Sequence, residues 1–513
     1  MFRFPLRSQD AVLKSELSEK VYTPADVLNL FDTLESDAPD LLLFLTHLQH
    51  IEVFEKRHPS DENPRKLLDV QIEEDCLQPV AEYRKQFVRS IQDNKLLRTT
   101  QTHEPISVCY PMVIRIQKYC DGAIIQTEIR QFVISLYCAG SDTVSTKISE
   151  ISKTLKVLPW VGVALPIDIK KSNDSDGYYS PTNSKTSSFP EASGRIFCFL
   201  PLPKEAKSPT GLRFHVHGYF SLNQNRRHIK WPSGDQQTQN LQDPHLIWNI
   251  FLLKTLIPKA ALNLAVHLTQ LSTRQESVFA KLVKRSAAGD DSSSIKWFLC
   301  NLVYSIMPDI TTYQWEPLAD VFYREIFSKQ QKLFFSPVSG GNWHCAHGAN
   351  AIFVDGSDTS QLVQIIRDIM SHSKTIFLPV PPHVTIGVEK YNGNVLQKHS
   401  PTTVCHMLKA TEQSLKFTDG DKLILLDYLL NGVGDFADLI GLKLLPIDNG
   451  EWTTFKLNIG QMREEIYIPS QKHQQQLLPG LNQYFIRANL TDSCMQHMAD
   501  LATQGKFFSR GIY

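Results

Sequence analysis

Three side chains that could bind a metal stand together in the segment NWHCAHG: His344, Cys345 and His347. Imidazole and thiolate groups are common zinc ligands, but a zinc site needs three or four of them directed at one ion. Ligands this close in sequence cannot easily all do so, and no second ligand pair follows at a recognisable spacing. We therefore expect a turn at a strand edge here, and no metal site.

A second histidine pair, His215 and His217, lies in the alternating segment RFHVHGYF. Alternate residues of a strand face the same side, so both rings would share a face with Arg213. Phe214 and Val216 would point the other way. Two ligands on one strand face suit a metal, but a third partner is not apparent. We expect a solvated or interdomain face instead.

The basic segment NRRHIK, which contains Arg226 and Arg227, follows directly on this strand. Arginine offers a planar set of donors that suits phosphate or carboxylate groups. A loop in this place could present the two arginines to a neighbouring domain. The alternative is a solvated loop without a functional role.

Motifs of common catalytic sites are absent from the sequence. There is no GxxxxGK[ST] phosphate loop, no GxGxxG after a strand, no GxSxG nucleophile elbow and no HExxH zinc helix. The segment Gly432–Asp435 (GVGD) lies between an expected helix and an expected strand, in the wrong order for a phosphate loop. We predict a plain turn there, no catalytic residue, no cofactor and no enzymatic activity of the chain itself.

Composition sets broad limits on function. The 513 residues are 42% hydrophobic, enough for several domains with a large core. Lysine plus arginine equals aspartate plus glutamate at 53 each, which gives no general electrostatic reason to bind nucleic acid or an anionic membrane. The nine cysteines include no CxxC pair and are interpreted as reduced core residues of a cytoplasmic protein.

The segments that must position these groups alternate between helical and strand-like patterns. Asp121-Gly122 between two strand-like runs predicts a hairpin. Thr23-Pro24 predicts the start of a helix, and the apolar stretch Leu246–Val266 predicts a buried helix rather than a membrane span. IFCFLPL, from Ile196, predicts one continuous strand buried on both faces. The expected fold class is α+β, a multidomain arrangement of mixed helices and mainly antiparallel sheets.

Several of these segments resemble, in order, the signatures of the internal repeats of the sacsin family. They are FRFPLR, GRIFCFLPLP, TGLRFHVHGYFSL followed by NRR, Trp248-Asn249, and DLIGLKLLPIDNGEWTTF. In such repeats an ATPase domain similar to that of the Hsp-ninety chaperones comes first, and FRFPLR resembles its last strand. The resemblance implies that the chain is a piece of a longer one and that the nucleotide-binding residues lie upstream. It also implies that the region after FRFPLR is comparable to a chaperone middle segment.

On this basis we divide the chain into five expected parts. These are the truncated end of the ATPase domain (1–20), a helical or mixed linker region (21–108), a β-rich middle segment (109–243) with a mobile insertion (170–193), a helical region (244–340) and an α/β C-terminal part (341–513).

The resemblance implies a chaperone or co-chaperone repeat that couples an upstream ATPase to client proteins or interdomain contacts. Expected partners are the adjacent ATPase domain and repeats, client proteins and other chaperones, without nucleic acid or membrane. Arg226 and Arg227 become candidates for contacting the nucleotide of the upstream ATPase. The alternative is a purely structural scaffold repeat with a protein–protein interaction role.

Overall fold

The computed structural model forms two compact units, unit 1 (Met1–Ser328) and unit 2 (Lys329–Tyr513). The boundary falls inside the region 244–340 that the sequence marks as helical. The expected strand FRFPL lies outside the described residues, as do positions 173–193 of the expected insertion. The described residues are 21, 23–56, 63–93, 104–172, 194–203, 210–231, 242–271, 292–309, 315–337, 341–346, 351–355, 360–373, 375–392, 397–411, 415–432, 436–456, 466–468, 479–487, 490–503 and 509–510.

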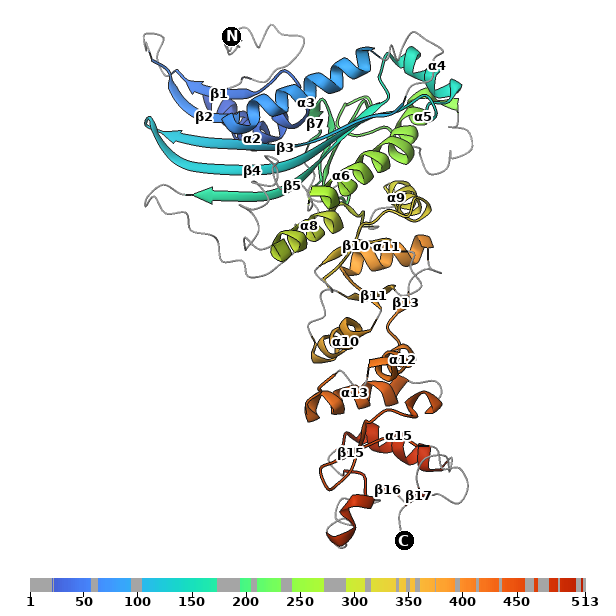
Figure 1. Cartoon of the computed structure of the whole chain (residues 1–513). Coiled ribbons are helices and arrows are strands. Elements are labelled where there is room, and N and C mark those ends of the chain that lie inside the picture. Colours follow the sequence, from blue (N-terminus) through green and yellow to red (C-terminus); the bar gives the residue numbers. More distant parts are fainter. Residues whose placement is uncertain are drawn as a thin grey trace. The chain divides into compact units, whose positions relative to one another are not determined.

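Unit 1 is built on an eight-stranded sheet of order β1-β2-β3-β4-β5-β8-β6-β7 (Figure 1). Neighbouring strands are antiparallel except for β6 and β8, which are parallel. The strands are β1 (His50–Glu55), β2 (Arg65–Ile72), β3 (Ile106–Cys120), β4 (Ala123–Cys138), β5 (Trp160–Ser172), β6 (Ile196–Cys198), β7 (Leu200–Pro201) and β8 (His215–Gly218).

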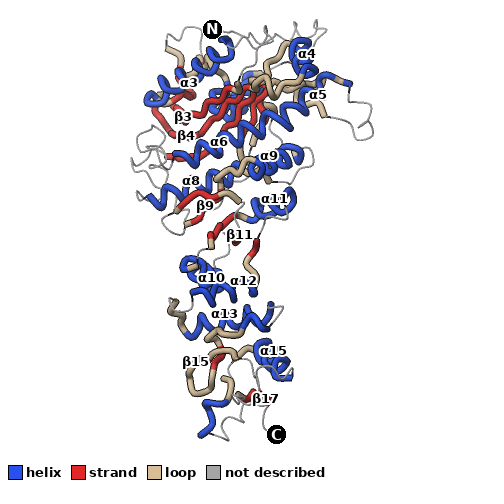
Figure 2. Tube along the Cα trace, turned by 45° about the vertical axis from the view of Figure 1, so that its right-hand side comes forward, coloured by secondary structure: helices blue, strands red, loops and turns tan. Residues whose placement is uncertain are grey.

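Helices cover this sheet on both faces. Val133 and Ile134 are successive residues of β4 and both are fully buried, although they must face opposite sides. Figure 2 shows these helices in blue around the red strands. The described helices of unit 1 are α2 (Pro24–Phe44), α3 (Glu74–Asp93), α4 (Thr146–Leu155), α5 (Pro244–Phe251), the π-helical turn η3 (Leu252–Leu256), α6 (Ile257–Leu271), α8 (Ser292–Ile306) and α9 (Glu316–Ser328). Of these, α2, α3 and α6 make the main contacts with the sheet, and α8 and α9 pack against α6.

Local sequence signals account for the start of α2 and for the turn between β3 and β4 in unit 1. The Thr23 hydroxyl accepts from the backbone N–H of Asp26 at 3.3 Å, and the Asp26 carboxylate accepts from the Thr23 N–H at 2.8 Å, which is a capping box. Asp121 and Gly122 have φ values of 51° and 83°, as a two-residue turn between antiparallel strands requires. Both predictions are confirmed.

The longest apolar helical stretch of unit 1 runs through α5, η3 and α6. Among the described residues, Pro244–Leu271 is the one helix long and apolar enough to cross a membrane by length and composition. Its residues Trp248, Leu252, Leu256 and Leu264 are fully buried, as expected for a core helix. The wide turn η3 precedes Pro258, whose ring lacks an N–H and would clash with the carbonyl one turn before it in a regular helix.

The prediction of one continuous strand over IFCFLPL, buried on both faces, is wrong. The chain reverses at Phe199, whose φ is 65°, so that β6 and β7 are two short antiparallel strands. Phe199 and Leu200 are 43% and 57% exposed, and they are not buried between two layers. The apolar run is therefore a hairpin at the edge of the sheet.

Unit 2 combines small sheets with a helical core. Its main sheet has the order β12-β11-β13, and all three strands are parallel. The strands are β9 (Phe334–Ser336), β10 (Asn342–His344), β11 (Ala351–Asp355), β12 (Ile376–Val380), β13 (Gln397–Lys398), β14 (Leu445–Pro446), β15 (Trp452–Thr453), β16 (Tyr467–Ile468) and β17 (Ser509–Arg510).

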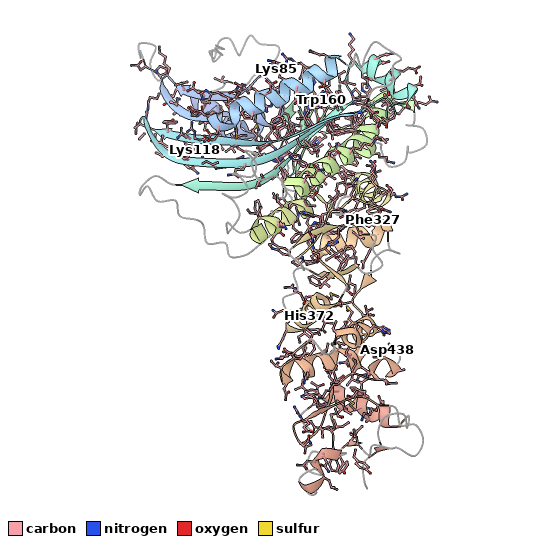
Figure 3. All side chains as sticks on the ribbon, in the orientation of Figure 1. Lys85, Lys118, Trp160, Phe327, His372 and Asp438 are labelled. Atoms are coloured by element: carbon pink, nitrogen blue, oxygen red, sulfur yellow. The ribbon has the colours of Figure 1, made fainter. Side chains whose placement is uncertain are left out.

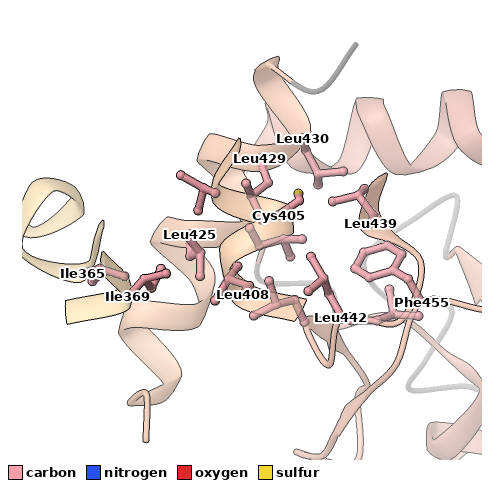
Figure 4. Packing of buried hydrophobic residues seen from close by; sticks show 14 of the residues in the cluster. Ile365, Ile369, Cys405, Leu408, Leu425, Leu429, Leu430, Leu439, Leu442 and Phe455 are labelled. Atoms are coloured by element: carbon pink, nitrogen blue, oxygen red, sulfur yellow. The ribbon is translucent and has the colours of Figure 1, made fainter. Parts of the chain in front are cut away.

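The core of unit 2 lies among α10, α12, α13 and the segment that contains η5, where Ile369, Cys405, Leu429 and Leu442 are at most 1% exposed (Figure 4). The helix α10 (Gln361–His372) contributes Ile365, Ile366 and Ile369, apolar residues at helical spacing, to this core. The helices are α10 (Gln361–His372), α11 (Pro382–Asn392), α12 (Pro401–Thr411), α13 (Asp419–Gly432), α15 (Asp492–Thr503) and the 3-10 turns η5 (Phe436–Leu439) and η6 (Pro479–Tyr484). Taken together, the two units have the α+β architecture expected from the sequence.

Candidate functional site

The predicted arginine pair lies on a narrow loop that follows β8, residues 221–230, here called the arginine loop. Leu222 and Ile229 form an antiparallel bridge near its base. Arg226 and Arg227 are both exposed, and among the described residues neither guanidinium makes an ion pair. The structure therefore presents two unneutralised positive charges on a loop that is itself held by backbone pairing.

The turn at the tip of the arginine loop is fixed by Asn223. Its side-chain oxygen accepts from the backbone N–H groups of Arg227 and His228, each at 3.2 Å. Its backbone carbonyl accepts from the N–H of Arg226 at 2.9 Å. Arg226 adopts a left-handed conformation with φ of 56°, which residues with a side chain rarely adopt.

The base of the arginine loop is held by α5. The buried Asn249 donates to the carbonyls of Ser221 and Lys230 at 2.8 and 3.0 Å, and its oxygen accepts from the Ser221 N–H at 2.8 Å. The Trp248 indole donates to the Tyr219 carbonyl at 2.9 Å. The Trp248-Asn249 pair of the sequence thus joins both sides of the loop to the core.

The Gly194-Arg195 pair, which directly precedes β6, has a structural role of the same kind. A Cβ on Gly194 would lie 2.3 Å from the Phe214 carbonyl oxygen and 2.7 Å from that of Leu212, so no side chain fits. The backbone N–H of Arg195 donates to Nδ1 of His215 at 3.1 Å, which makes that nitrogen an acceptor.

A largely buried ion-pair network joins α2, β4 and Arg195, the residue before β6, and sequence reasoning missed it. Nη1 of Arg195 lies 2.9 Å from a carboxylate oxygen of Asp37 and 2.8 Å from one of Asp40. Arg130 lies 3.5 Å from Asp40 and 2.5 Å from Glu128. Because Arg195 and Asp40 are 155 positions apart, no local pattern signals their pairing.

The interpretation of His215 and His217 as a solvated face is wrong. Their residues are 7% and 0% exposed, because β8 is an interior strand covered on both sides. The His217 ring stacks on Phe44 with ring centres 5.0 Å apart, and it lies 4.8 Å from Trp160, labelled in Figure 3. Burial lowers the pKa of His217 to about 3, an effect that an interaction with the Phe197 backbone opposes only in part. This ring stays neutral and belongs to an aromatic core.

The first three residues of the NWHCAHG segment form β10, whereas the expected turn falls largely on positions 347–350, outside the described residues. His344 ends β10, and burial and then the nearby Lys332 lower its pKa. The Cys345 thiol lies 2.8 Å from the Gln330 carbonyl oxygen, to which it donates. His347 lies outside the described residues, as do positions 433–435 of the GVGD segment.

Another group of possible metal ligands, which the sequence did not single out, lies on β1 and β2. Ligand atoms of His50, Glu52 and Asp69 lie within 4.8 Å of one another. The Lys66 ammonium lies 2.5 Å from Glu52 and 2.8 Å from Asp69, and these hydrogen bonds, led by that to Asp69, raise its pKa. An ammonium group thus already bridges these two carboxylates, and we interpret the group as an ion-pair cluster and not as a metal site.

The signature segment DLIGLKLLPIDNGEWTTF also has a structural role, in unit 2. Its Trp452 donates to Asp419 at 2.9 Å, and its ring lies 5.1 Å from the Lys422 ammonium and 5.3 Å from the Arg487 guanidinium. Gly450 has a φ of 91°, in a turn where a side chain would be strained. The strands β14 and β15 pair antiparallel on either side of this turn.

Comparisons with known proteins agree with the resemblance found in the sequence. A family model described as "Sacsin domain" matches residues 1–68. The chain is 26% identical to sacsin of Homo sapiens over 515 residues, which cover 98% of this chain and 10% of that protein. The chain thus spans about a tenth of the length of this curated relative. No solved structure matches the chain. The resemblance to a sacsin repeat is confirmed, whereas the comparison with a chaperone middle segment stays a prediction.

Proposed function

We propose that this sacsin-like chain is part of a chaperone or co-chaperone repeat in which it couples an upstream ATPase domain to client proteins or neighbouring domains. The observation that carries the proposal is the arginine loop, whose two charged side chains are exposed while its backbone is joined to the core by Asn249 and Trp248. A loop held in this way keeps its shape without a partner, which favours the recognition of one.

The second candidate is a structural scaffold repeat. It is favoured by the roles of the signature residues, since Gly194, Asn249 and Trp452 all hold the fold together and none is presented to a substrate. Both candidates place the chain in the cytoplasm, with adjacent ATPase domains and repeats as partners. They differ in whether the chain itself acts on an unfolding protein.

Holding of clients is tested by light scattering of a heat-unfolding client protein, with this chain added at equal concentration and without nucleotide. If the chain holds apolar segments, we expect scattering to be suppressed, and to be suppressed as strongly at high salt, because apolar contacts are not screened. Unchanged scattering, with the chain shown by circular dichroism to be folded, would contradict the holding function and leave the scaffold role.

A contribution of Arg226 and Arg227 to nucleotide turnover is tested in a sacsin repeat that includes the ATPase domain. The variant R226A/R227A is expected to lower the turnover of ATP by about tenfold or more, as does the removal of a positive charge that stabilises a phosphoryl-transfer transition state.

The matched control for that experiment is K85A/R89A, which removes two exposed cations from α3 (Figure 3 labels Lys85). It leaves the arginine loop intact and is expected to keep full turnover. Equal turnover in the wild type and in R226A/R227A would exclude the arginine pair from the reaction.

A further inference from the structure

The turn between β6 and β7 exposes two large apolar side chains at the edge of the sheet. Phe199 is 43% exposed and Leu200 is 57% exposed. The Phe199 ring contacts Tyr219, with ring centres 4.9 Å apart in an edge-to-face arrangement. Leu200 is therefore exposed directly after Phe199, a residue whose ring is held in place by its contact with Tyr219.

This apolar turn and the arginine loop leave the sheet at the same end. Because β6 and β8 are parallel, the segments after them emerge on one side. The two also touch at the base, where the Cys198 thiol lies 3.5 Å from the Phe220 carbonyl oxygen. At about 3.3 Å per extended residue, the loop rises by roughly 10 Å from Ser221 to its tip. An extended peptide of about six residues could therefore contact both the apolar turn and the tip of the arginine loop.

Both turns hold a residue with a side chain in the left-handed region. Five non-glycine residues have positive φ in the described part of the chain, and two of them, Phe199 and Arg226, lie at this one end of the sheet. Glycine would adopt these conformations without strain. An exposed aromatic ring and an exposed arginine in such strained positions favour a role in binding a partner over a role in stabilising the fold.

We propose that the Phe199–Leu200 turn and the arginine loop form one docking surface for an acidic peptide segment of a partner protein that carries a bulky apolar residue. The two guanidinium groups, which have no carboxylate partner among the described residues, would bind the acidic side chains. Leu200 would contact the apolar residue. The inference deepens the proposed interdomain contact and rests on it. A nucleotide alone would use the arginines but leave the apolar turn uncovered.

The test measures the fluorescence anisotropy of two labelled peptides, EDELWEDE and its charge-reversed analogue KRKLWKRK, titrated with the full chain. We expect the acidic peptide to bind more tightly, with an affinity that falls as salt is raised. R226A/R227A should weaken binding by about tenfold, and Leu200→Ser by about fivefold.

Matched controls separate this surface from general effects. K85A/R89A removes two exposed cations elsewhere, and Ile386→Ser removes an apolar side chain that is also 57% exposed but lies in unit 2. Both are expected to bind the acidic peptide like the wild type. Thermal unfolding of each variant, followed by circular dichroism, checks that the fold is kept.

The possible outcomes distinguish the docking surface from the nucleotide role and from the holding function. The docking surface would be overturned if the two peptides bound equally well. It would also be overturned if the control variants lost as much affinity for the acidic peptide as R226A/R227A and Leu200→Ser. Binding of a labelled ATP analogue that needs the arginines but not Leu200, without peptide binding, would favour the nucleotide role. Client scattering measured with the same variants is a separate readout: if it is suppressed while the peptide does not bind, the docking inference fails and the holding function stands.

Discussion

Replacing Arg195 by alanine is expected to lower the free energy of unfolding of unit 1 by about 3–5 kcal/mol. The guanidinium bonds Asp37 and Asp40, and the latter residue is only 5% exposed. Removing the cation leaves a buried carboxylate that, among the described residues, keeps only the more distant Arg130, at 3.5 Å, as a cationic neighbour. The substitution also removes the hydrogen bond to the Leu202 carbonyl, which joins the segment before β6 to the segment after β7.

Urea unfolding followed by tryptophan fluorescence measures this effect, because five of the seven tryptophans (160, 231, 248, 297 and 315) lie in unit 1. The control is Arg324→Ala, which breaks an exposed pair with Asp320 on α9 and should cost about 0.5 kcal/mol or less. Adding Asp40→Asn to Arg195→Ala should recover part of the loss, since it removes the unpaired charge. A loss no larger than that of the control would show that the network does not stabilise the unit.

Lowering the pH from 7 to 3 is expected to destabilise unit 1 by about 4–5 kcal/mol through His217 alone. The pKa of this ring falls from 6.5 to about 3 on folding because the ring is buried. Below pH 6.5 the unfolded chain binds a proton that the folded chain does not, so stability falls as the pH falls. The loss stops near pH 3, where the folded form is also protonated.

The variant His217→Phe isolates this contribution. It keeps an aromatic ring against Phe44 and Trp160 but cannot bind a proton, so its stability should fall less steeply between pH 6.5 and 3, by about 1.4 kcal/mol per pH unit. The control is His228→Phe, at an exposed ring of the arginine loop. Identical pH slopes for the wild type and His217→Phe would show that His217 is protonated equally in the folded and unfolded states.

Features encoded by neighbouring residues could be predicted from the sequence. The capping box at Thr23 and the turn at Asp121-Gly122 depend on hydrogen bonds and backbone angles within four residues. The helix Gln361–His372 results from the spacing of apolar residues along one face. The exposure of Arg226 and Arg227 was also predictable, from a short polar segment after a strand.

Features that depend on which surfaces meet could not be predicted in this way. An apolar run such as IFCFLPL fits a strand buried on both faces as well as a hairpin at a sheet edge, and only the packing against Tyr219 and Phe220 decides for the hairpin. Likewise, the alternation of residue types around His217 showed that the two faces of its strand differ. It could not show that other segments cover both of these faces.

The resemblance to a sacsin repeat, the α+β class, the absence of familiar catalytic motifs and the position of the arginine pair all follow from the order of residues along the chain. The bond from Arg195 to Asp40 across 155 positions, and the hydrogen bonds by which Asn249 holds the base of the arginine loop, are visible only in the folded chain. The reason is physical: local hydrogen bonds and periodicity are set by adjacent residues, whereas the burial of a charge or an imidazole is set by segments that meet only when the chain has folded.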